Sequence, residues 1–234
     1  MQLHVSEAVL ADGFWKNLDG SALDEEAARD AESIHIVSNT LAQAFPGATG
    51  SMSLSATKSL WLLAKYFAPQ TIVEIGTYIG RSTSALYLGA RPGIEKLYTC
   101  DATFDSWSAG HLSDKGDIEY FGRTTSTQML EKLSRDGVVA DLFFIDGRLQ
   151  DPDICLIQSI SHDKTVFILD DFEGLEKGVA NGVALKSAFP GLLLLSPPHD
   201  GLVRRFSSGH NLAVLLPKIA INITAQVPLP LTML

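Results

Sequence analysis

From residue 71 onward, short apolar runs alternate with longer segments in which apolar residues recur at helical spacing. The apolar runs that predict buried strands are residues 71–75, 96–100, 118–121, 141–145, 165–169, 192–195 and 212–216. The segments that predict helices between them are residues 82–88, 125–134, 152–161 and 175–188. Apolar strands that alternate with helices are typical of a mostly parallel sheet with helices on both faces.

The last two apolar runs are joined by a stretch rich in polar residues, glycine and proline, without a helical pattern. Such a connection favours an antiparallel hairpin, because a parallel pair needs a crossover that is usually helical. We therefore expect an α/β fold, a doubly wound, mostly parallel, seven-stranded Rossmann-like sheet with an antiparallel last strand.

The first fifty residues add helical sequence in front of this core. Ser21 and Asp24 resemble a helix start, apolar residues follow on one stripe, and Pro46-Gly47 ends a helix predicted over residues 21–45. The expected organisation is an N-terminal helical addition at 1–53, a core at 54–217 and a C-terminal tail at 218–234.

Two of these segments carry more apolar surface than a core of this type needs. They are the helix at residues 21–45 and the uncharged stretch at residues 219–234. Apolar surface outside a core is a sign of contact with another subunit or with a ligand. The sequence therefore predicts a homo-oligomer.

Charge and cysteine content narrow the classes of partner. The chain has 18 basic and 27 acidic residues in 234, a formal net charge of −9, which argues against a nucleic-acid partner. No signal pattern opens the sequence, and the longest uncharged run is shorter than the roughly 20 apolar residues that span a membrane. That run is too short for a span, so we expect no membrane partner. Both cysteines lie in apolar stretches, which favours a reduced, cytoplasmic protein.

A glycine loop follows the first predicted strand, in the string VEIGTYIGRST that begins at Val73. Glycine lets a chain turn tightly and approach a ligand, and the helix that follows presents free N–H groups. The spacing of Gly76 and Gly80 fits neither a phosphate-binding P-loop nor a dinucleotide fingerprint. A plain strand-to-helix turn remains the alternative.

The pattern Glu-x-Gly-x-x-x-Gly within this string resembles the class I S-adenosylmethionine-dependent methyltransferases. The string EIGTYIGRST is most similar to the O-methyltransferase branch that includes catechol, caffeoyl-CoA and macrolide-sugar enzymes, over residues 54–217. The resemblance implies S-adenosylmethionine as the cofactor. It also implies that the methionine half of that cofactor is lined by the residues of the loop: Glu74, Gly76, Thr77, Tyr78, Gly80 and Ser82.

An acid ends the second predicted strand. A carboxylate at that place can accept hydrogen bonds from both hydroxyls of a ribose, so Asp101 is the candidate ribose ligand that the resemblance implies. Thr124 follows the third strand, where the resemblance implies a contact with adenine. The alternative is that Asp101 is a surface acid at a strand end.

Three further carboxylates end two predicted strands that should be neighbours. Asp146 follows residues 141–145, and Asp170 and Asp171 follow residues 165–169. Ligands of open α/β sheets collect at the carboxyl ends of strands, and carboxylate oxygens suit Mg²⁺. The resemblance implies that Asp146, Asp170 and Asp171 hold a divalent ion, with Asp146 also next to the cofactor in a catalytic role. Alternatively, one carboxylate contacts the cofactor and the others cap the loop that follows.

The sequence offers no clear general base. Relatives that use a side-chain base carry Lys or Asp shortly after the first metal ligand, where this chain has Arg148. Arginine stays protonated, so we expect Arg148 to bind an anionic group of the substrate. His111 and His199, in loops expected near the mouth of the crevice, are the candidate bases, although a loop histidine is often only solvent-exposed.

The predicted function is the transfer of a methyl group from S-adenosylmethionine to a hydroxyl of a small molecule, assisted by a divalent metal. A cofactor-binding protein of the same fold without catalysis is one alternative, because a base is missing. An NAD-dependent oxidoreductase on the same kind of sheet is another.

Overall fold

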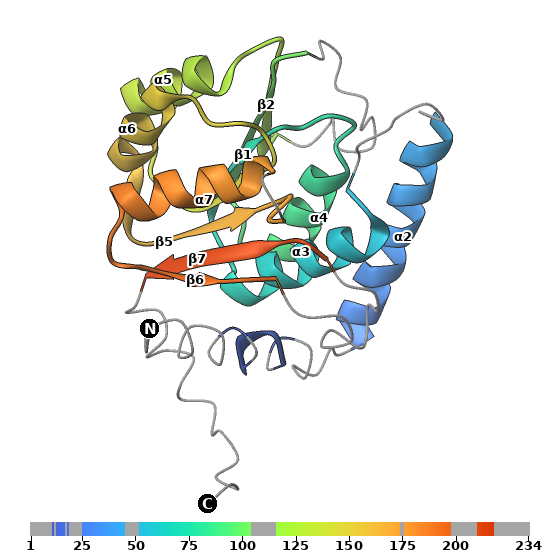
Figure 1. Ribbon diagram of the computed structural model, residues 1–234. Helices are drawn as coiled ribbons and strands as arrows, with labels where there is room; N and C mark the ends of the chain where they lie inside the picture. The colour runs from blue at the N-terminus through green and yellow to red at the C-terminus, as the bar shows by residue number, and fades with distance from the viewer. Residues whose placement is uncertain are drawn as a thin grey trace, which may run out of the picture.

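Seven strands form one sheet through the centre of the molecule, in the order β3-β2-β1-β4-β5-β7-β6 (Figure 1). The computed structural model describes residues 11, 13–16, 18, 25–44, 52–103, 116–173, 176–197 and 210–217. The strands are β1 (Thr71–Ile75), β2 (Lys96–Asp101), β3 (Ile118–Gly122), β4 (Ala140–Ile145), β5 (Ser161–Leu169), β6 (Leu192–Leu195) and β7 (Ala213–Pro217).

The strand directions confirm the predicted fold class. Strands β1 to β5 pair in parallel, whereas β7 runs antiparallel to both β5 and β6. The expected hairpin between the last two strands is therefore present, and β7 is inserted between β5 and β6.

The register of the parallel strands determines where the loops that follow them meet. Ile75 pairs with Cys100 on one side and Ile145 on the other, and Ile145 pairs with Leu169. The residues that come next in the chain therefore leave the sheet side by side: Gly76, Asp101, Asp146 and Asp170. The carboxyl ends of four strands thus form one edge, as expected for a ligand site of this fold.

Helices cover both faces of the sheet (Figure 1). On one face lie α2 (Glu25–Ala44), α3 (Leu54–Phe67) and α4 (Arg81–Ala90). On the other lie α5 (Ser126–Arg135), α6 (Asp151–Ser159) and α7 (Lys177–Ala188). Successive strand residues point to opposite faces, so Ile72 belongs to the core under α3 and α4, and Val73 to the core under α5.

Helix α2 packs its apolar stripe against the core. Ile34 and Leu41 on this stripe are buried. Arg81, at the start of α4, donates from Nη1 to the carbonyl oxygen of Met52 at 2.5 Å and from Nη2 to that of Ser38 at 3.4 Å. These contacts join the N-terminal helix to the core, although the division into addition, core and tail stays a prediction, and the tail lies outside the described residues.

Both cysteines are free thiols, Cys100 buried on β2 and Cys155 exposed on α6. None of the described helices has the length and apolar character that a membrane span requires.

Candidate functional site

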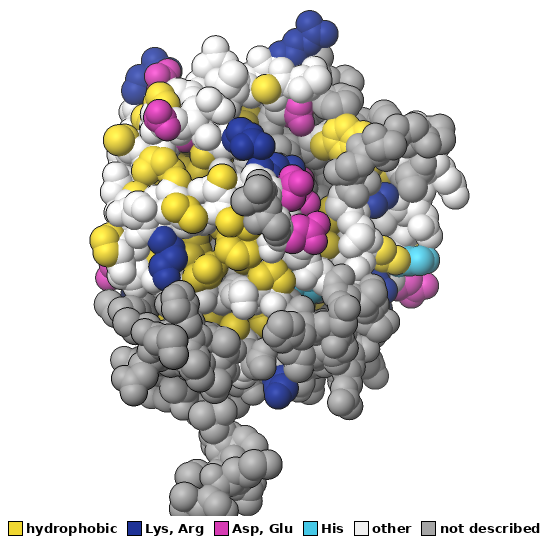
Figure 2. Space-filling view, in the orientation of Figure 1, with side chains coloured by type: hydrophobic (Ala, Val, Ile, Leu, Met, Phe, Trp, Pro, Cys, Tyr) yellow, Lys and Arg dark blue, Asp and Glu magenta, His cyan; other side chains and the backbone are white. Residues whose placement is uncertain are grey.

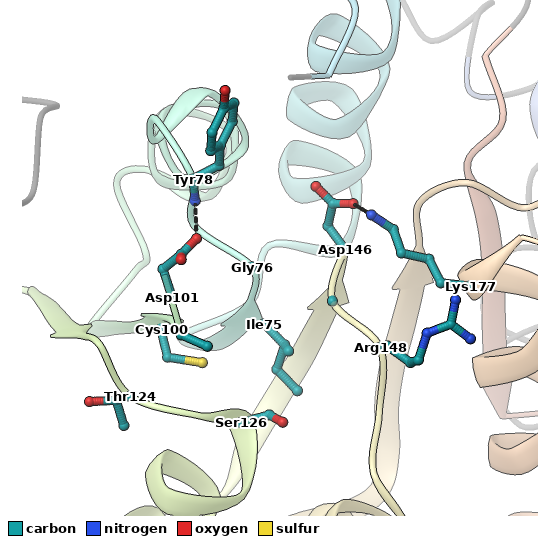
Figure 3. Close-up of a pocket in the computed structure, with 12 residues that line it drawn as sticks. Ile75, Gly76, Tyr78, Cys100, Asp101, Thr124, Ser126, Asp146, Arg148 and Lys177 are labelled. Carbon is teal, nitrogen blue, oxygen red and sulfur yellow. Dashed lines mark hydrogen bonds and ion pairs between the residues drawn. The ribbon is translucent and has the colours of Figure 1, made fainter. Parts of the chain in front are cut away.

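A pocket of about 330 Å³ opens at the carboxyl ends of β1, β2 and β4 (Figure 3). A volume of this size is within the range of small-molecule sites. Its lining residues are Ile75, Gly76, Tyr78, Cys100, Asp101, Ala102, Thr124, Ser126, Asp146, Gly147, Arg148 and Lys177. Six of the residues proposed from sequence are therefore brought together here: Gly76, Tyr78, Asp101, Thr124, Asp146 and Arg148.

The glycine loop forms one wall of the pocket. Gly76 has φ +102° and Gly80 has φ +82°, a left-handed conformation that glycine adopts without strain. A Cβ on Gly76 would lie 3.1 Å from the amide nitrogen of Gly147 and 3.2 Å from the carbonyl carbon of Asp146. The missing side chain is thus what lets β1 turn against the end of β4.

Glu74 lies behind the loop and does not line the pocket. Its carboxylate is fully buried and accepts hydrogen bonds from the hydroxyls of Ser82 (2.5 Å), Thr83 (2.5 Å) and Thr99 (2.6 Å). Burial raises the pKa of Glu74 to about 7, although the three hydroxyl donors act to lower it. Glu74 therefore ties β1 to β2 and to the first turn of α4, behind the loop that lines the pocket.

Three other loop residues predicted to line the cofactor also have positions of their own. Thr77 and Ser82 border a small adjoining void of about 10 Å³ that Tyr78 and Asp146 also line. The Thr77 hydroxyl lies 2.5 Å from that of Thr99, which donates to Glu74. Gly80 is the N-cap of α4 and does not line the pocket.

Asp101 presents its carboxylate at the opposite wall. Its Oδ2 accepts the backbone N–H of Tyr78 at 2.8 Å, which draws the glycine loop toward β2 (Figure 3). Its Oδ1 accepts the N–H of Thr103 at 2.8 Å. The N–H of Thr124 donates to the Asp101 carbonyl oxygen at 3.1 Å, so β3 ends beside the same wall.

The third wall contains an ion pair that sequence reasoning missed. The Lys177 Nζ lies 2.7 Å from Asp146 Oδ1 and 3.0 Å from Asp171 Oδ2. Burial acts to lower the pKa of the Lys177 ammonium, but the two carboxylates outweigh it and the pKa lies above its ordinary value. Burial raises the pKa of Asp146, and Lys177 opposes that shift. Figure 2 shows acidic and basic side chains next to one another beside the start of α7.

The three aspartates proposed as metal ligands do not form a ligand set. Asp170 is buried, does not line the pocket, and accepts the N–H of Asp171 at 2.9 Å. Burial and the nearby Asp146 carboxylate raise the pKa of Asp170 to about 7. Asp171 accepts from Asn211 Nδ2 at 3.1 Å and from Lys177. Within the described ranges, no group of three or more His, Cys, Asp or Glu side chains is arranged to hold a metal ion.

A signal for Lys177 is present in the sequence. It is the first residue of α7 and directly precedes Gly178. A positive side chain in the first turn of a helix opposes the helix dipole, so another interaction must favour it there. A lysine at a predicted helix start, next to a strand that ends in two acids, is therefore a sign of an ion pair. Ser126, the first residue of α5, also lines the pocket and carried no motif.

Three residues proposed to act on the substrate or as a base remain: Arg148, His111 and His199. Arg148 lines the pocket, is exposed, and makes no side-chain ion pair within the described ranges (Figure 3). His111 and His199, the candidate bases, lie outside the described residues.

Comparison with known proteins relates the fold of this chain to solved structures. No protein-family model and no curated protein sequence matches the chain. The O-methyltransferase TomG from Streptomyces achromogenes, of tomaymycin synthesis and solved with S-adenosylmethionine, is 21% identical, with 84% of this chain and 91% of that chain covered and a TM-score of 0.55.

Two further solved structures match most of their own length. An O-methyltransferase from Bacillus cereus, solved with S-adenosylhomocysteine, is 18% identical, with 91% of this chain and 99% of that chain covered and a TM-score of 0.58. A methyltransferase from Podospora anserina bound to S-adenosylhomocysteine is 17% identical, with coverage of 85% and 99% and a TM-score of 0.54. The chain therefore has the fold of solved S-adenosylmethionine-dependent methyltransferases, as the sequence predicted.

Proposed function

We propose that this protein is an S-adenosylmethionine-dependent methyltransferase that acts on a hydroxyl of a small molecule. One observation carries the proposal: a glycine loop and two acids, Asp101 and Asp146, leave three paired strands side by side and line one pocket. Solved structures with this fold include enzymes bound to S-adenosylmethionine or to S-adenosylhomocysteine.

The side chains of the pocket fit the proposed cofactor. Gly76 lets the backbone come close to a ligand, because it lacks the Cβ that would occupy the turn. Asp101 is placed to accept hydrogen bonds from the two hydroxyls of a ribose. Asp146, on the other side of the loop, offers a carboxylate to a positively charged part of the ligand. When bound, S-adenosylmethionine supplies a methyl group activated by its sulfonium sulfur.

The wall beyond Asp146 is the proposed acceptor side. Arg148 and Lys177 bring two positive charges to this wall, which favours an acceptor with an anionic or strongly polar group. The task of the residues here is to hold the acceptor oxygen in line with the methyl group. Such orientation alone can contribute about 7 kcal/mol or more to a rate enhancement. The small-molecule acceptor and the homo-oligomer both remain predictions from the sequence.

A divalent ion does not fit the side chains in their present arrangement. Asp146 and Asp171 are paired with an ammonium, and Asp170 is turned toward a backbone N–H. The residues of the chain itself therefore have to orient the acceptor in the proposed methyl transfer.

Calorimetric titration with S-adenosylmethionine, S-adenosylhomocysteine and NAD tests the proposal. We expect both sulfur-containing ligands to bind and NAD not to bind. Asp101→Asn should weaken S-adenosylmethionine roughly 10- to 100-fold, because a hydrogen bond to a charged group contributes about 1.5–3 kcal/mol. Asp163→Asn is the matched control. It removes the same charge from an exposed residue near the start of β5, whereas the pocket lies at the carboxyl ends of the strands.

Two results would contradict the proposal. The first is binding of NAD in preference to S-adenosylmethionine, which would favour the oxidoreductase alternative. The second is unchanged affinity for S-adenosylmethionine in an Asp101→Asn protein whose melting temperature equals that of the Asp163→Asn control.

A further inference from the structure

The ammonium of Lys177 connects two strand ends of the site. It lies 2.7 Å from a carboxylate oxygen of Asp146, after β4, and 3.0 Å from one of Asp171, after β5. The side chains of Lys177, Asp146 and Asp171 are 27%, 18% and 37% exposed. The group therefore lies in the wall of the pocket, where water screens the charges less than on an open surface.

The backbone around Lys177 holds it at this place. A Cβ on Gly178 would lie 2.0 Å from the Asp170 carbonyl oxygen and 2.7 Å from that of Asp171, so only glycine permits this approach of α7 to β5. Asn181, one turn later, donates to the Gly147 carbonyl oxygen at 2.8 Å and accepts the Leu149 N–H at 3.1 Å. The start of α7 thus contacts the segments that follow β4 and β5, and Lys177, its first residue, lies between these two segments.

The ammonium also neutralises charge that would otherwise be unfavourable. Asp146, Asp170 and Asp171 all follow the ends of β4 and β5, and like charges this close repel one another. A cation between two of the carboxylates relieves that repulsion. Lysine has three N–H donors, of which Asp146 and Asp171 take two. Because Lys177 also lines the pocket, the third N–H remains for a ligand oxygen.

We propose that Lys177 is the resident cation of this site: its ammonium takes the position between Asp146 and Asp171 that a divalent ion would need, and it offers its third N–H to the acceptor oxygen. Only the contact with the acceptor rests on the proposed methyl transfer. The exclusion of a metal ion by the ammonium follows from the ion pairs themselves and is testable without any substrate.

Calorimetric titration with Mn²⁺, a cation that carboxylate oxygens bind well, tests the exclusion. The wild-type protein should take up no Mn²⁺ at this site. Lys177→Met, which keeps an unbranched side chain one atom shorter and removes its charge, should bind one Mn²⁺ at least tenfold more tightly than the wild type. Lys186→Met is the matched control, because it removes a lysine from the last turn of the same helix, and it should behave as the wild type does.

A second variant identifies the ligands of the new ion. Adding Asp171→Asn to Lys177→Met should abolish Mn²⁺ binding, because the site then loses one of its carboxylates. Lys177→Ala is the alternative if the methionine variant does not fold, as judged by circular dichroism. Lys177→Arg should exclude Mn²⁺ as the wild type does, since it keeps a positive charge.

Two outcomes would overturn the inference. Stoichiometric Mn²⁺ binding by the wild type, as tight as by Lys177→Met, would mean that a metal ion displaces the ammonium. A folded Lys177→Met or Lys177→Ala protein that binds no Mn²⁺ would mean that the carboxylates form no cation site. Neither outcome depends on S-adenosylmethionine, whereas failure of the cofactor titration would contradict the proposed function and leave this inference standing.

Discussion

Residue 76 is a glycine for two physical reasons, its backbone conformation and the lack of space for a side chain. Its φ of +102° is one that residues with a side chain adopt only at a cost, and a Cβ there would crowd the backbone at the end of β4. At Gly137 only the backbone conformation favours glycine: its φ is +72°, but no neighbouring atom lies within 4 Å of the position of a Cβ. Substituting each glycine by alanine therefore separates the free-energy cost of the backbone conformation from the cost of steric contact.

We expect Gly76→Ala to lower the free energy of unfolding by roughly 2–5 kcal/mol, since left-handed backbone costs about 1–2 kcal/mol and overpacking typically 1–3 kcal/mol. Gly137→Ala should lose only about 1–2 kcal/mol, from the backbone alone. Urea unfolding of both variants measures the difference. Equal losses would show that the loop relaxes away from Gly147 and that close contact with β4 is not required.

At the scale of secondary-structure elements, α7 is the part that completes the site. Its first turn approaches the end of β5 at Gly178, and Gly182 one turn later would place a Cβ 2.8 Å from a ring carbon of Phe172. The two glycines lie on one side of the helix, which brings its backbone against the end of β5. The ion pairs of Lys177 follow from that approach.

Gly178→Ala should therefore move the start of α7 away from β5. We expect a loss of roughly 1–3 kcal/mol in the free energy of unfolding, because the new methyl group would meet backbone oxygens that cannot move independently. Gly191→Ala is the control, since nothing lies within 4 Å of its Cβ position. Thermal unfolding of the two variants is the measurement, and a stable Gly178→Ala protein would contradict the packing described here.

Most elements could be predicted from the sequence because their hydrophobic pattern is strong. The strands at residues 71–75 and 192–195 have the predicted bounds, and the other five predicted runs all lie within observed strands to within one residue. The start of β5 was wrong. Residues 161–164 are polar and partly exposed, so they carry no apolar signal, although Ser161 pairs with Ala140, and the predicted helix at 152–161 ran into them.

Some residues of the candidate site could likewise be predicted from the sequence, and others could not. Gly76, Asp101 and Asp146 could be found because each directly follows a predicted strand, and the ends of parallel strands meet. Lys177 belongs to a helix whose approach to the sheet depends on tertiary packing at Gly178, which hydrophobic periodicity does not report. Glu74 was assigned to the cofactor because the motif contains it, but the motif does not report that its carboxylate is buried and bonded to Ser82 on α4 and to Thr99 on β2.

At the scale of the whole molecule, buried groups make stability depend on pH in opposite directions: Glu74 and Asp170, whose pKa values burial raises to about 7, favour low pH, whereas His210 favours high pH. The pKa of Glu74 is raised by burial from 4.5 to about 7, so its contribution is fully present below pH 4.5 and is lost as the pH rises to 7. The pKa of His210 is lowered by burial from 6.5 to about 4, so its contribution is present above pH 6.5 and is lost as the pH falls through 4.

Each single variant should therefore remove the pH dependence of its own group, while Asp170 continues to contribute in both variants. Glu74→Gln should remove a loss of about 3 kcal/mol between pH 4.5 and 7, and His210→Phe should remove a loss of similar size between pH 6.5 and 4. Phenylalanine keeps an aromatic ring beside Trp15, whose ring centroid lies 4.9 Å from that of His210. Urea unfolding from pH 4 to 8 measures both, and parallel pH profiles for wild type and variants would contradict the assignment.

The two free thiols differ in burial, so their reactivity reports whether the sheet around β2 is intact or opened. Cys155 is exposed on α6, whereas Cys100 is buried on β2, where burial raises the pKa of its thiol to about 12. The thiolate is the nucleophile that attacks a thiol reagent, so in the folded chain Cys155 can react and Cys100 is protected. Cys100 is only 2% exposed at the wall of the pocket, so its thiol should react readily only after β2 opens. The number of modified cysteines therefore distinguishes the intact sheet from the opened one, without any substitution in the chain.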